Sequence, residues 1–414
     1  MSQTLSDIPA TVNYLLSPQA IRDRSQILFD RACADQLDHF RCDLNQLPAA
    51  ADYVIGVMQQ HYPAGDIPVH SRWRHFEVEG QSRLALMEPD LSHMNAMDRA
   101  RLKVDLAIVS VLLDAGAGSQ WQYVEPKTGK EFRRSEGLAI ASFHSFYAGL
   151  FSSIPNQPWQ ANAKGLSNLT PEALPQAFQV SDDNPLVGIG GRTQLLQQLG
   201  QVLQHNPEYF GHANPRPGGL VDYWLKACPN KNLPAGLVLT TILRSLGDIW
   251  PGRIELNGTN LGDVWPHPKL PAVRPGDGLV PFHKLSQWLT YSLLEPLAEL
   301  GLPIVDLDAL TGLAEYRNGG LLIDTGVLVP KRAAILSQPQ IPGSPAIVEW
   351  RALTVILLDR LADQIRHRLN QSVQELPLPK ILQGGTWAAG RQLARENRPN
   401  GAPPIQIVSD GTVF

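Results

Sequence analysis

The fold class is indicated most clearly by the stretch VDLAIVSVLL, residues 104–113. Its apolar side chains recur at helical spacing and leave almost no polar face, so we expect a helix that is buried on nearly all sides. Outward from this stretch, other helical windows recur along the chain, whereas strand-like stretches are short. The helical windows are 49–61, 135–150, 193–205, 236–249, 281–300 and 347–369, and the strand-like stretches are 121–124, 130–133 and 405–408. The sequence therefore predicts a mainly α fold with a few short strands, the first two pairing across a turn.

A chain of 414 residues exceeds what one hydrophobic core usually serves. We expect two helical lobes that share one continuous body, with a pocket in the cleft between them. The loop-rich region 152–175 is the predicted boundary. It separates an N-terminal lobe, 1–152, from a C-terminal lobe, 153–414, which carries most candidate site residues.

Charge and composition exclude several classes of partner. The net charge of −4 and the absence of a dense Lys/Arg block argue against nucleic acid. No apolar run approaches the roughly 20 residues of a membrane helix, and the N-terminus lacks the pattern of a signal peptide. Three cysteines without CxxC spacing fit free thiols in a reducing compartment. We expect a soluble, cytoplasmic protein without disulfides; the sequence indicates no oligomeric state.

No cofactor is indicated. The 11 histidines form no HExxH or HxH motif and no His/Cys ligand set, so a transition-metal site has little support. The glycines at 188–191 lack the spacing of a Rossmann or P-loop motif and follow no clear strand.

The first stretch that could carry chemistry is RPGDGLVPFHKLSQWLTY, residues 274–291. Pro-Gly-Asp-Gly predicts a turn and Pro281 suits the first turn of a helix, which places His283, Gln287 and Tyr291 on one face. A helix start that carries His283, Lys284 and exposed backbone N–H groups can bind a phosphate. The same pattern also fits an amphipathic surface helix whose histidine is merely solvated.

The second stretch is DLDALTGLAEYRNGGLLIDTG, residues 306–326. Asp308 and Glu315 are seven residues apart, so on a helix both carboxylates share a face. Paired acids can stabilise a glycosyl cation and position water. Arg317 would point elsewhere unless the helix ends at the Asn-Gly-Gly break. In the alternative interpretation Asp308 caps the helix and Glu315 makes a surface ion pair.

The third stretch is EFRRSEG, residues 131–137. Ser135 is expected as the N-cap of a helix, with Glu136 in its first turn. Arg133 and Arg134 either hold an anion or pair with the neighbouring glutamates.

Four longer stretches carry a family resemblance. They are RSEGLAIASFHSFYAGLFS (134–152), GDGLVPFHKLSQWLTYSLLEPL (276–297), AEYRNGGLLIDTGVL (314–328) and VEWRALTVILLDRLAD (348–363). By these stretches the chain resembles, over essentially its whole length, the uracil catabolism protein 4 family, a domain of unknown function. The resemblance implies a role in the pathway that converts uracil to its ribonucleotide, opens the ring and releases urea. From the logic of that pathway we infer cleavage of a ribosylurea-type N-glycosidic bond.

A second, weaker resemblance is to the queuosine-salvage nucleosidases. His283-Lys-Leu-Ser-Gln287, Ala314-Glu-Tyr-Arg317 and Gly326-Val-Leu328 are similar to motifs of those proteins in order and spacing. That family implies a helical, DNA-glycosylase-like fold and hydrolysis of an N-ribosidic bond. Glu315 would stand where the family has an acidic residue beside Tyr-Arg, and Lys284 would match a lysine of the upstream helix. The acid is Glu here instead of Asp, and Asn-Gly-Gly follows Arg317 where the salvage enzymes have other residues.

The leading hypothesis is a hydrolase for a small ribose phosphate or ribosylurea-type substrate. Glu315 would stabilise an oxocarbenium-like transition state or orient water, with Asp277 or Asp308 as the second acid. The expected substrate-binding residues are His283, Lys284, Gln287, Trp288, Tyr316, Arg317, Asp324 and Arg134.

Two other functions stay open. One is a metal-dependent amidase or ureidohydrolase that acts on the opened ring. Its metal ligands would be drawn from Asp277, His283, Asp324 and His267. The other is a non-catalytic pathway partner that binds the intermediate.

Overall fold

The computed structural model describes residues 8–114, 116–118, 120–250 and 252–408. Helices dominate this part of the chain, and its strands form only two-stranded sheets, so the mainly α prediction is confirmed. The chain forms two compact units, each built from discontinuous segments. Of the described residues, the first unit takes 8–70, 252–287 and 306–408, and the second takes 71–250 and 288–305. The boundary predicted near residue 152 lies inside the second unit.

The first unit carries the first candidate stretch up to Gln287 and the whole of the second stretch. Its helices are α1 (Ile8–Leu15), α2 (Pro18–Cys33), α3 (Leu47–His61), α14 (Tyr316–Asp324), α15 (Ala334–Ser337), α16 (Pro345–Leu369), α17 (Leu378–Ile381) and α18 (Trp387–Asn397), with the short 3₁₀ turns η1 (Leu44–Gln46) and η5 (Leu307–Ala309) and the π-helix η6 (Leu382–Thr386). Its strand pairs are β1 (Phe40–Cys42) with β10 (Leu328–Pro330), β5 (Glu255–Leu256) with β6 (Thr259–Asn260), and β7 (Val264–Pro266) with β8 (Leu279–Pro281), all antiparallel.

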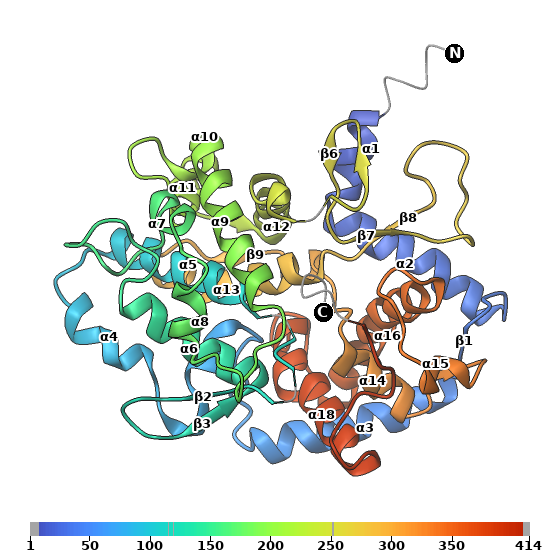
Figure 1. Ribbon diagram of the computed structural model, residues 1–414. Coiled ribbons are helices and arrows are strands. Elements are labelled where there is room, and N and C mark those ends of the chain that lie inside the picture. Colours follow the sequence, from blue (N-terminus) through green and yellow to red (C-terminus); the bar gives the residue numbers. More distant parts are fainter. Residues whose placement is uncertain (1–7, 115, 119, 251, 409–414) are drawn as a thin grey trace. The chain divides into compact units, whose positions relative to one another are not determined.

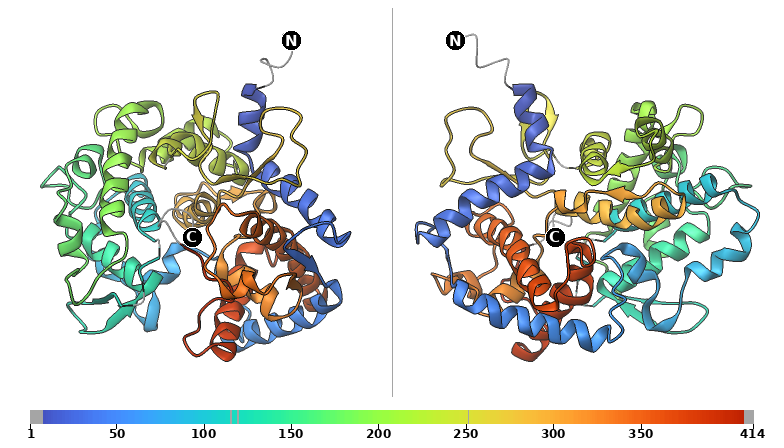
Figure 2. Two further views of the ribbon diagram at one scale, coloured as in Figure 1. Left: turned by 45° about the vertical axis from the view of Figure 1, so that its right-hand side comes forward. Right: turned by 180° about the vertical axis from the view of Figure 1, so that it is seen from behind.

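Helix α16 forms the core of the first unit. Ser344 caps its N-terminus by accepting the backbone N–H of Ile347, Pro345 opens it, and Asn370 ends it in the left-handed conformation with φ 51°. Sixteen of its side chains, from Ala346 to Ile365, are buried. It packs against α2, α3 and α14 (Figure 1). The views in Figure 2 show α3, in blue, lying along the red helices α16 and α18.

Helix α13 (Lys284–Glu299) belongs to both units, because its first four residues lie in the first and the rest in the second. A helix was predicted over 281–300. The structure starts it three residues later because Pro281 pairs with Val264 in the β7–β8 ladder.

The second unit holds the stretch that predicted the fold class. Its other helices are α4 (Leu84–Leu91), α5 (Ala96–Leu112), α6 (Arg134–Tyr147), α7 (Ala163–Ser167), α8 (Ala173–Ala177), α9 (Ile189–His205), α10 (Pro207–Phe210), α11 (Gly219–Ala227) and α12 (Ala235–Ser245), with the turns η2 (Arg72–Phe76), η3 (Val78–Gly80) and η4 (Gly247–Ile249). Its strand pairs are β2 (Gln122–Val124) with β3 (Glu131–Arg133), antiparallel, and β4 (Leu233–Pro234) with β9 (Ile304–Val305), parallel.

Helix α5 is buried nearly all round, as its sequence predicts. Its residues 104–112 are all buried, and it packs against α6, α9 and α11. The predicted hairpin is confirmed too, since Tyr123 pairs with Phe132 in the β2–β3 ladder.

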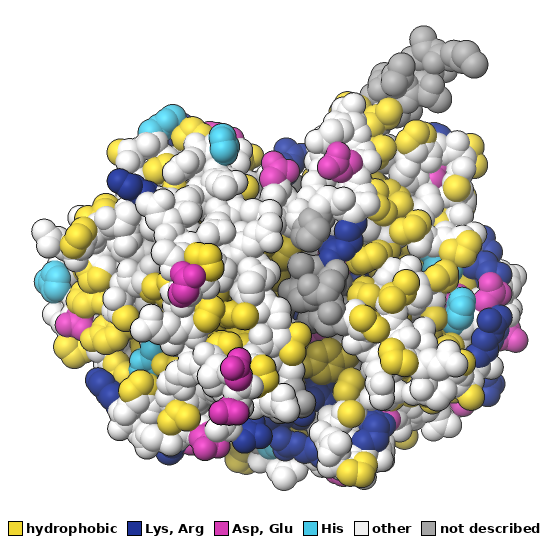
Figure 3. Space-filling model, viewed as in Figure 1, with side chains coloured by type: hydrophobic (Ala, Val, Ile, Leu, Met, Phe, Trp, Pro, Cys, Tyr) yellow, Lys and Arg dark blue, Asp and Glu magenta, His cyan; other side chains and the backbone are white. Residues whose placement is uncertain are grey.

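On the face in Figure 3, Asp and Glu side chains lie among the Lys and Arg side chains. The three cysteines, all in the described part of the chain, are free, as expected. Within that part, no helix has the length and apolarity needed to cross a bilayer.

Candidate functional site

Glu315 is the N-cap of α14. Its backbone is extended (φ −119°, ψ 167°), and its carboxylate accepts the first free N–H groups of the helix. Oε2 lies 2.8 Å from the amide nitrogen of Arg317, and Oε1 lies 2.6 Å from that of Asn318. A carboxylate in this position also meets the positive end of the helix dipole. The structure therefore fixes the direction of the Glu315 side chain through both oxygens.

The prediction that Asp308 and Glu315 share one helix face is wrong. Asp308 lies in the short turn η5 and is exposed, and residues 310–314 are not helical. The two acids belong to different elements because α14 begins only after Glu315 has capped it.

From the sequence, a helix that ends at Asn-Gly-Gly was considered. In the structure these three residues lie inside α14. The Asn318 side chain donates to the carbonyl oxygen of Leu313 at 3.1 Å. A Cβ on Gly319 would lie 2.6 Å from the indole of Trp350. The glycine therefore allows α14 to approach α16 closely, and Arg317 lies in the first turn of the helix.

Burial and charge act against each other on Glu315. The residue is only 7% exposed, and burial raises the pKa of its carboxyl group. The amides of Arg317 and Asn318 and the charges of Lys284 and Arg317 oppose that rise. The site thus holds a desolvated acid beside two cations, an arrangement common at functional sites.

The two cations come from the starts of two helices. Lys284 is the first residue of α13 and is half-buried, and its backbone N–H donates to Asp263 Oδ2 at 3.1 Å. Arg317 is 6% exposed and donates from one terminal nitrogen to the carbonyl oxygen of Gly401 at 2.9 Å. Its guanidinium carbon lies 5.1 Å from the ring centre of Tyr316, which is half-buried. Lys284, Glu315, Tyr316 and Arg317 are the predicted residues that the structure brings together.

His283 and Gln287 lie at the same helix start, with their polar atoms directed to the backbone of the first unit. His283 has φ 46° and is 1% exposed, and its Nε2 lies 2.8 Å from the carbonyl oxygen of Leu15. Burial lowers the pKa of this imidazole. Gln287 donates to the carbonyl oxygen of Phe282 and accepts the N–H of Thr311 at 2.9 Å. The predicted alignment of His283 with Gln287 on one helix face fails, because His283 precedes the helix.

Asp277 and Asp324 each have a partner away from Glu315. Asp277 Oδ2 accepts the backbone N–H of Arg274 at 2.9 Å, and its Oδ1 lies 3.8 Å from Arg24. Asp324 makes a two-pronged ion pair with Arg398, at 2.9 and 2.5 Å.

Trp288 and Arg134 belong to the second unit. The ring centre of Trp288 lies 5.6 Å from the guanidinium carbon of Arg72. Arg134 is exposed and has φ 55°.

Ser135 is not the N-cap of α6, contrary to prediction. That position is Arg133, which makes no capping bond through its side chain. The Ser135 hydroxyl instead lies 2.7 Å from both carboxylate oxygens of Asp114.

The residues suggested as metal ligands have separate contacts. Asp277, His283 and Asp324 have the partners given above, and His267 Nε2 lies 3.5 Å from Glu349 Oε1. Within the described ranges, no group of three or more His, Cys, Asp or Glu side chains is arranged to hold a metal ion. The amidase hypothesis therefore gains no ligand set from these residues.

The sequence interpretation missed the ion pair between Asp263 and Arg351. The guanidinium of Arg351, on α16, binds both carboxylate oxygens of Asp263 at 2.7 Å. Burial would raise the pKa of Asp263, but Arg351, Trp265 and the N–H of Lys284 outweigh it and lower the pKa to about 2. The partners are 88 residues apart, so no local pattern could have revealed them.

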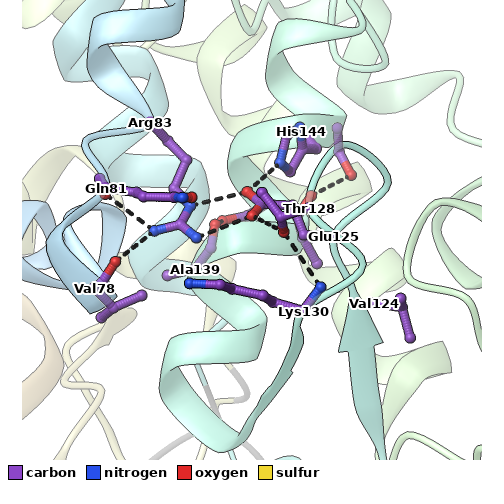
Figure 4. Close-up of polar contacts among 12 residues, drawn as sticks. Val78, Gln81, Arg83, Val124, Glu125, Thr128, Lys130, Ala139 and His144 are labelled. Carbon is purple, nitrogen blue, oxygen red and sulfur yellow. Dashed lines mark hydrogen bonds and ion pairs between the residues drawn. The ribbon is translucent and has the colours of Figure 1, made fainter.

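A second buried cluster, in the second unit, was also missed (Figure 4). Arg83 binds both oxygens of Glu125, at 2.9 and 3.0 Å. His144 Nε2 lies 3.0 Å from Oε1, and the Thr128 hydroxyl donates to Oε2 at 2.8 Å. A carboxylate offers about four acceptor positions, and these four contacts use them. The cluster therefore fixes the β2–β3 hairpin onto α6 and leaves no acceptor for a ligand.

Comparison with known proteins gives full-length relatives. Residues 14–414 match the family described as "Protein of unknown function (DUF1688)". The chain is 40% identical to "Protein urg3" of Schizosaccharomyces pombe over 416 residues, which cover 98% of this chain and 99% of the relative. It is 38% identical to "Uracil catabolism protein 4" of Lachancea kluyveri over 437 residues, covering 97% and 99%. The chain therefore belongs to the DUF1688 family.

Proposed function

We propose that this protein acts in uracil catabolism by hydrolysing the N-ribosidic bond of a ring-opened uridine nucleotide of the ribosylurea type. The name of the Lachancea kluyveri relative supports the pathway. The observation that carries the reaction is the buried carboxylate of Glu315, held by two backbone N–H groups beside Lys284 and Arg317.

In this reaction one carboxylate must lie beside the positive charge that develops on the sugar. As the bond between C1′ and the urea nitrogen breaks, the sugar becomes oxocarbenium-like. The N–H groups of Arg317 and Asn318 each use one acceptor position of Glu315, which leaves about one on each oxygen for the sugar or for water. Water then adds its oxygen to C1′, and the nitrogen leaves with a proton, so the products are urea and ribose 5-phosphate.

The cations have a separate task. Lys284 and Arg317 would hold the 5′-phosphate by charge-assisted hydrogen bonds and so orient the sugar against Glu315. Asp308 is exposed, and Asp277 accepts a backbone N–H of its own turn, so Glu315 alone would stabilise the positive charge on the sugar.

The test is incubation with ribosylurea 5′-phosphate, measuring urea and ribose 5-phosphate. We expect release of both in equal amounts, and Glu315→Gln should lower turnover by at least about a hundredfold. The variant should still fold, since glutamine keeps one acceptor and the lost capping bond costs about 1 kcal/mol.

The matched control is Glu349→Gln. Glu349 is also a buried glutamate of the first unit that accepts backbone N–H groups, those of His39 and Phe40. Its substitution should lower stability but leave turnover per folded molecule within about threefold. Tight binding of ribose 5-phosphate without urea release by the unmodified protein would refute the hydrolase and favour a binding role.

A further inference from the structure

The Asp263–Arg351 ion pair has contacts at both of its ends with the segments that carry Glu315 and Lys284. On one side, Asp263 Oδ2 accepts the backbone N–H of Lys284 at 3.1 Å. On the other, Arg351 Nε donates to the carbonyl oxygen of Ala314 at 3.2 Å. Ala314 directly precedes Glu315. A continuous chain of hydrogen bonds therefore joins the start of α13 to the cap of α14.

The surroundings hold this pair in one geometry. The guanidinium carbon of Arg351 lies 4.1 Å from the ring centre of Phe282, and Arg351 is 1% exposed. Asp263 also accepts the indole N–H of Trp265 at 2.8 Å, and its backbone carbonyl accepts the N–H of Phe282 at 2.9 Å. Neither side chain can rotate without losing several bonds.

The stability of the fold does not by itself require an ion pair at this place. Desolvation of two buried charges offsets much of their attraction, so a well-packed apolar pair of similar volume is often equally stable. An apolar pair, however, cannot bind two backbone segments at fixed distance and angle. The property specific to the ion pair is the relative placement of the segments.

We propose that Arg351 and Asp263 are positioning residues that set the separation between Lys284 and Glu315. Arg351 comes from the core helix α16, so both segments are positioned relative to the helix that buries sixteen side chains in the first unit. The consequence for catalysis rests on the proposed function, because a sugar held by Lys284 must meet Glu315 at one distance. The placement itself does not depend on that function.

The experiment replaces the pair by apolar residues, Arg351→Met with Asp263→Leu. The readout that needs no activity is the ¹³C chemical shift of reductively dimethylated Lys284, assigned by its loss in Lys284→Arg. In the unmodified background Glu315→Gln should move this resonance, since the acid lies near the lysine. In the apolar double variant the shift caused by Glu315→Gln should fall to about a third or less, because electrostatic effects weaken with separation.

Turnover gives the second readout. The double variant should lose at least about tenfold in kcat with KM within about threefold, since misplacement affects the transition state more than ground-state binding. Should the double variant not fold, Arg351→Lys keeps the charge but loses the forked geometry, and the same two readouts apply.

The matched control is the buried pair Arg83 and Glu125 of the second unit, replaced as Arg83→Met with Glu125→Leu (Figure 4). It should leave both the Lys284 shift and kcat unchanged. The positioning role would be overturned if Glu315→Gln moved the Lys284 resonance as far in the apolar Arg351 variant as in the unmodified background. It would also be overturned if the control variant lost as much of the shift response or of kcat as the apolar Arg351 variant. If the unmodified protein releases no urea while the shift behaves as expected, the proposed function fails and the positioning role stands.

Discussion

Gly390 allows α18 to pack directly on the backbone that carries the candidate site. A Cβ at this position would lie 2.9 Å from the carbonyl carbon of Arg317, and closer still to its oxygen. The obstacle is backbone, which cannot rotate away as a flexible side chain can. We therefore predict that Gly390→Ala pushes the first turn of α14 away from α18.

The magnitude follows from two opposing terms. Alanine in a helix gains about 1 kcal/mol over glycine. Overpacking a tight contact costs typically 1–3 kcal/mol, and a backbone obstacle favours the upper end, about 3 kcal/mol. The free energy of unfolding should therefore fall by about 2 kcal/mol. Turnover should fall as well, since Arg317 and the Glu315 cap shift with the helix.

Gly56 provides the same chemical change without the obstacle. It lies inside α3 and is exposed, and a Cβ there would meet no atom within 4 Å. Gly56→Ala should raise the free energy of unfolding by up to about 1 kcal/mol. The assay is urea unfolding followed by far-ultraviolet circular dichroism. If Gly390→Ala proves as stable as the unmodified protein while Gly56→Ala behaves as stated, the packing argument is refuted.

Three further predictions concern single side chains. Because the native pKa of Asp263 is lowered to about 2 from 3.8, its ionisation stabilises the fold by about 2 kcal/mol above pH ~4. That contribution is lost as the pH falls towards 2. The free energy of unfolding, measured with urea between these pH values, should therefore decrease as the pH falls, and Asp263→Asn should weaken this pH dependence. The pKa of Glu315 is raised in the folded protein. Its contribution to the free energy of unfolding is therefore greatest at a pH below its pKa in the unfolded chain, and it declines as the pH rises. Glu315→Gln should cost less stability at neutral pH than near pH ~4, and equal costs at the two pH values would contradict this. Gln287→Leu should lower the free energy of unfolding by about 2 kcal/mol, because the buried N–H of Thr311 loses its acceptor; an unchanged urea midpoint would argue against it.

Local patterns predicted the elements well and their junctions poorly. The long helices α5 and α16 follow from apolar spacing, because burial of an apolar face is what forms them. Residues 310–314 are also mostly apolar, and they were wrongly included in a helix with Asp308 and Glu315. Glutamate is an uncommon N-cap, so the signal that α14 starts at Tyr316 was weak.

The sequence predicted the residues of the candidate site, but it did not predict the contacts that hold them in place. Lys284, Glu315, Tyr316 and Arg317 lie in two short motifs whose order the sequence shows. The contacts that hold them come from Arg351 on α16 and from Asp263, which lies in a separate loop. Ion pairs between segments far apart in the sequence produce no periodic pattern that could be recognised. For the same reason, a single boundary could not describe two units whose segments alternate along the chain.

In the proposed reaction, water attacks the sugar carbon. Hydrolysis of ribosylurea 5′-phosphate in ¹⁸O-labelled water, quenched early and analysed by mass spectrometry, shows which atom the water oxygen reaches. We expect label in the ribose 5-phosphate and unlabelled urea, with labelled ribose phosphate strongly reduced in Glu315→Gln. Label in a carbonyl product derived from the ureido group, with the ribosidic bond intact, would contradict it.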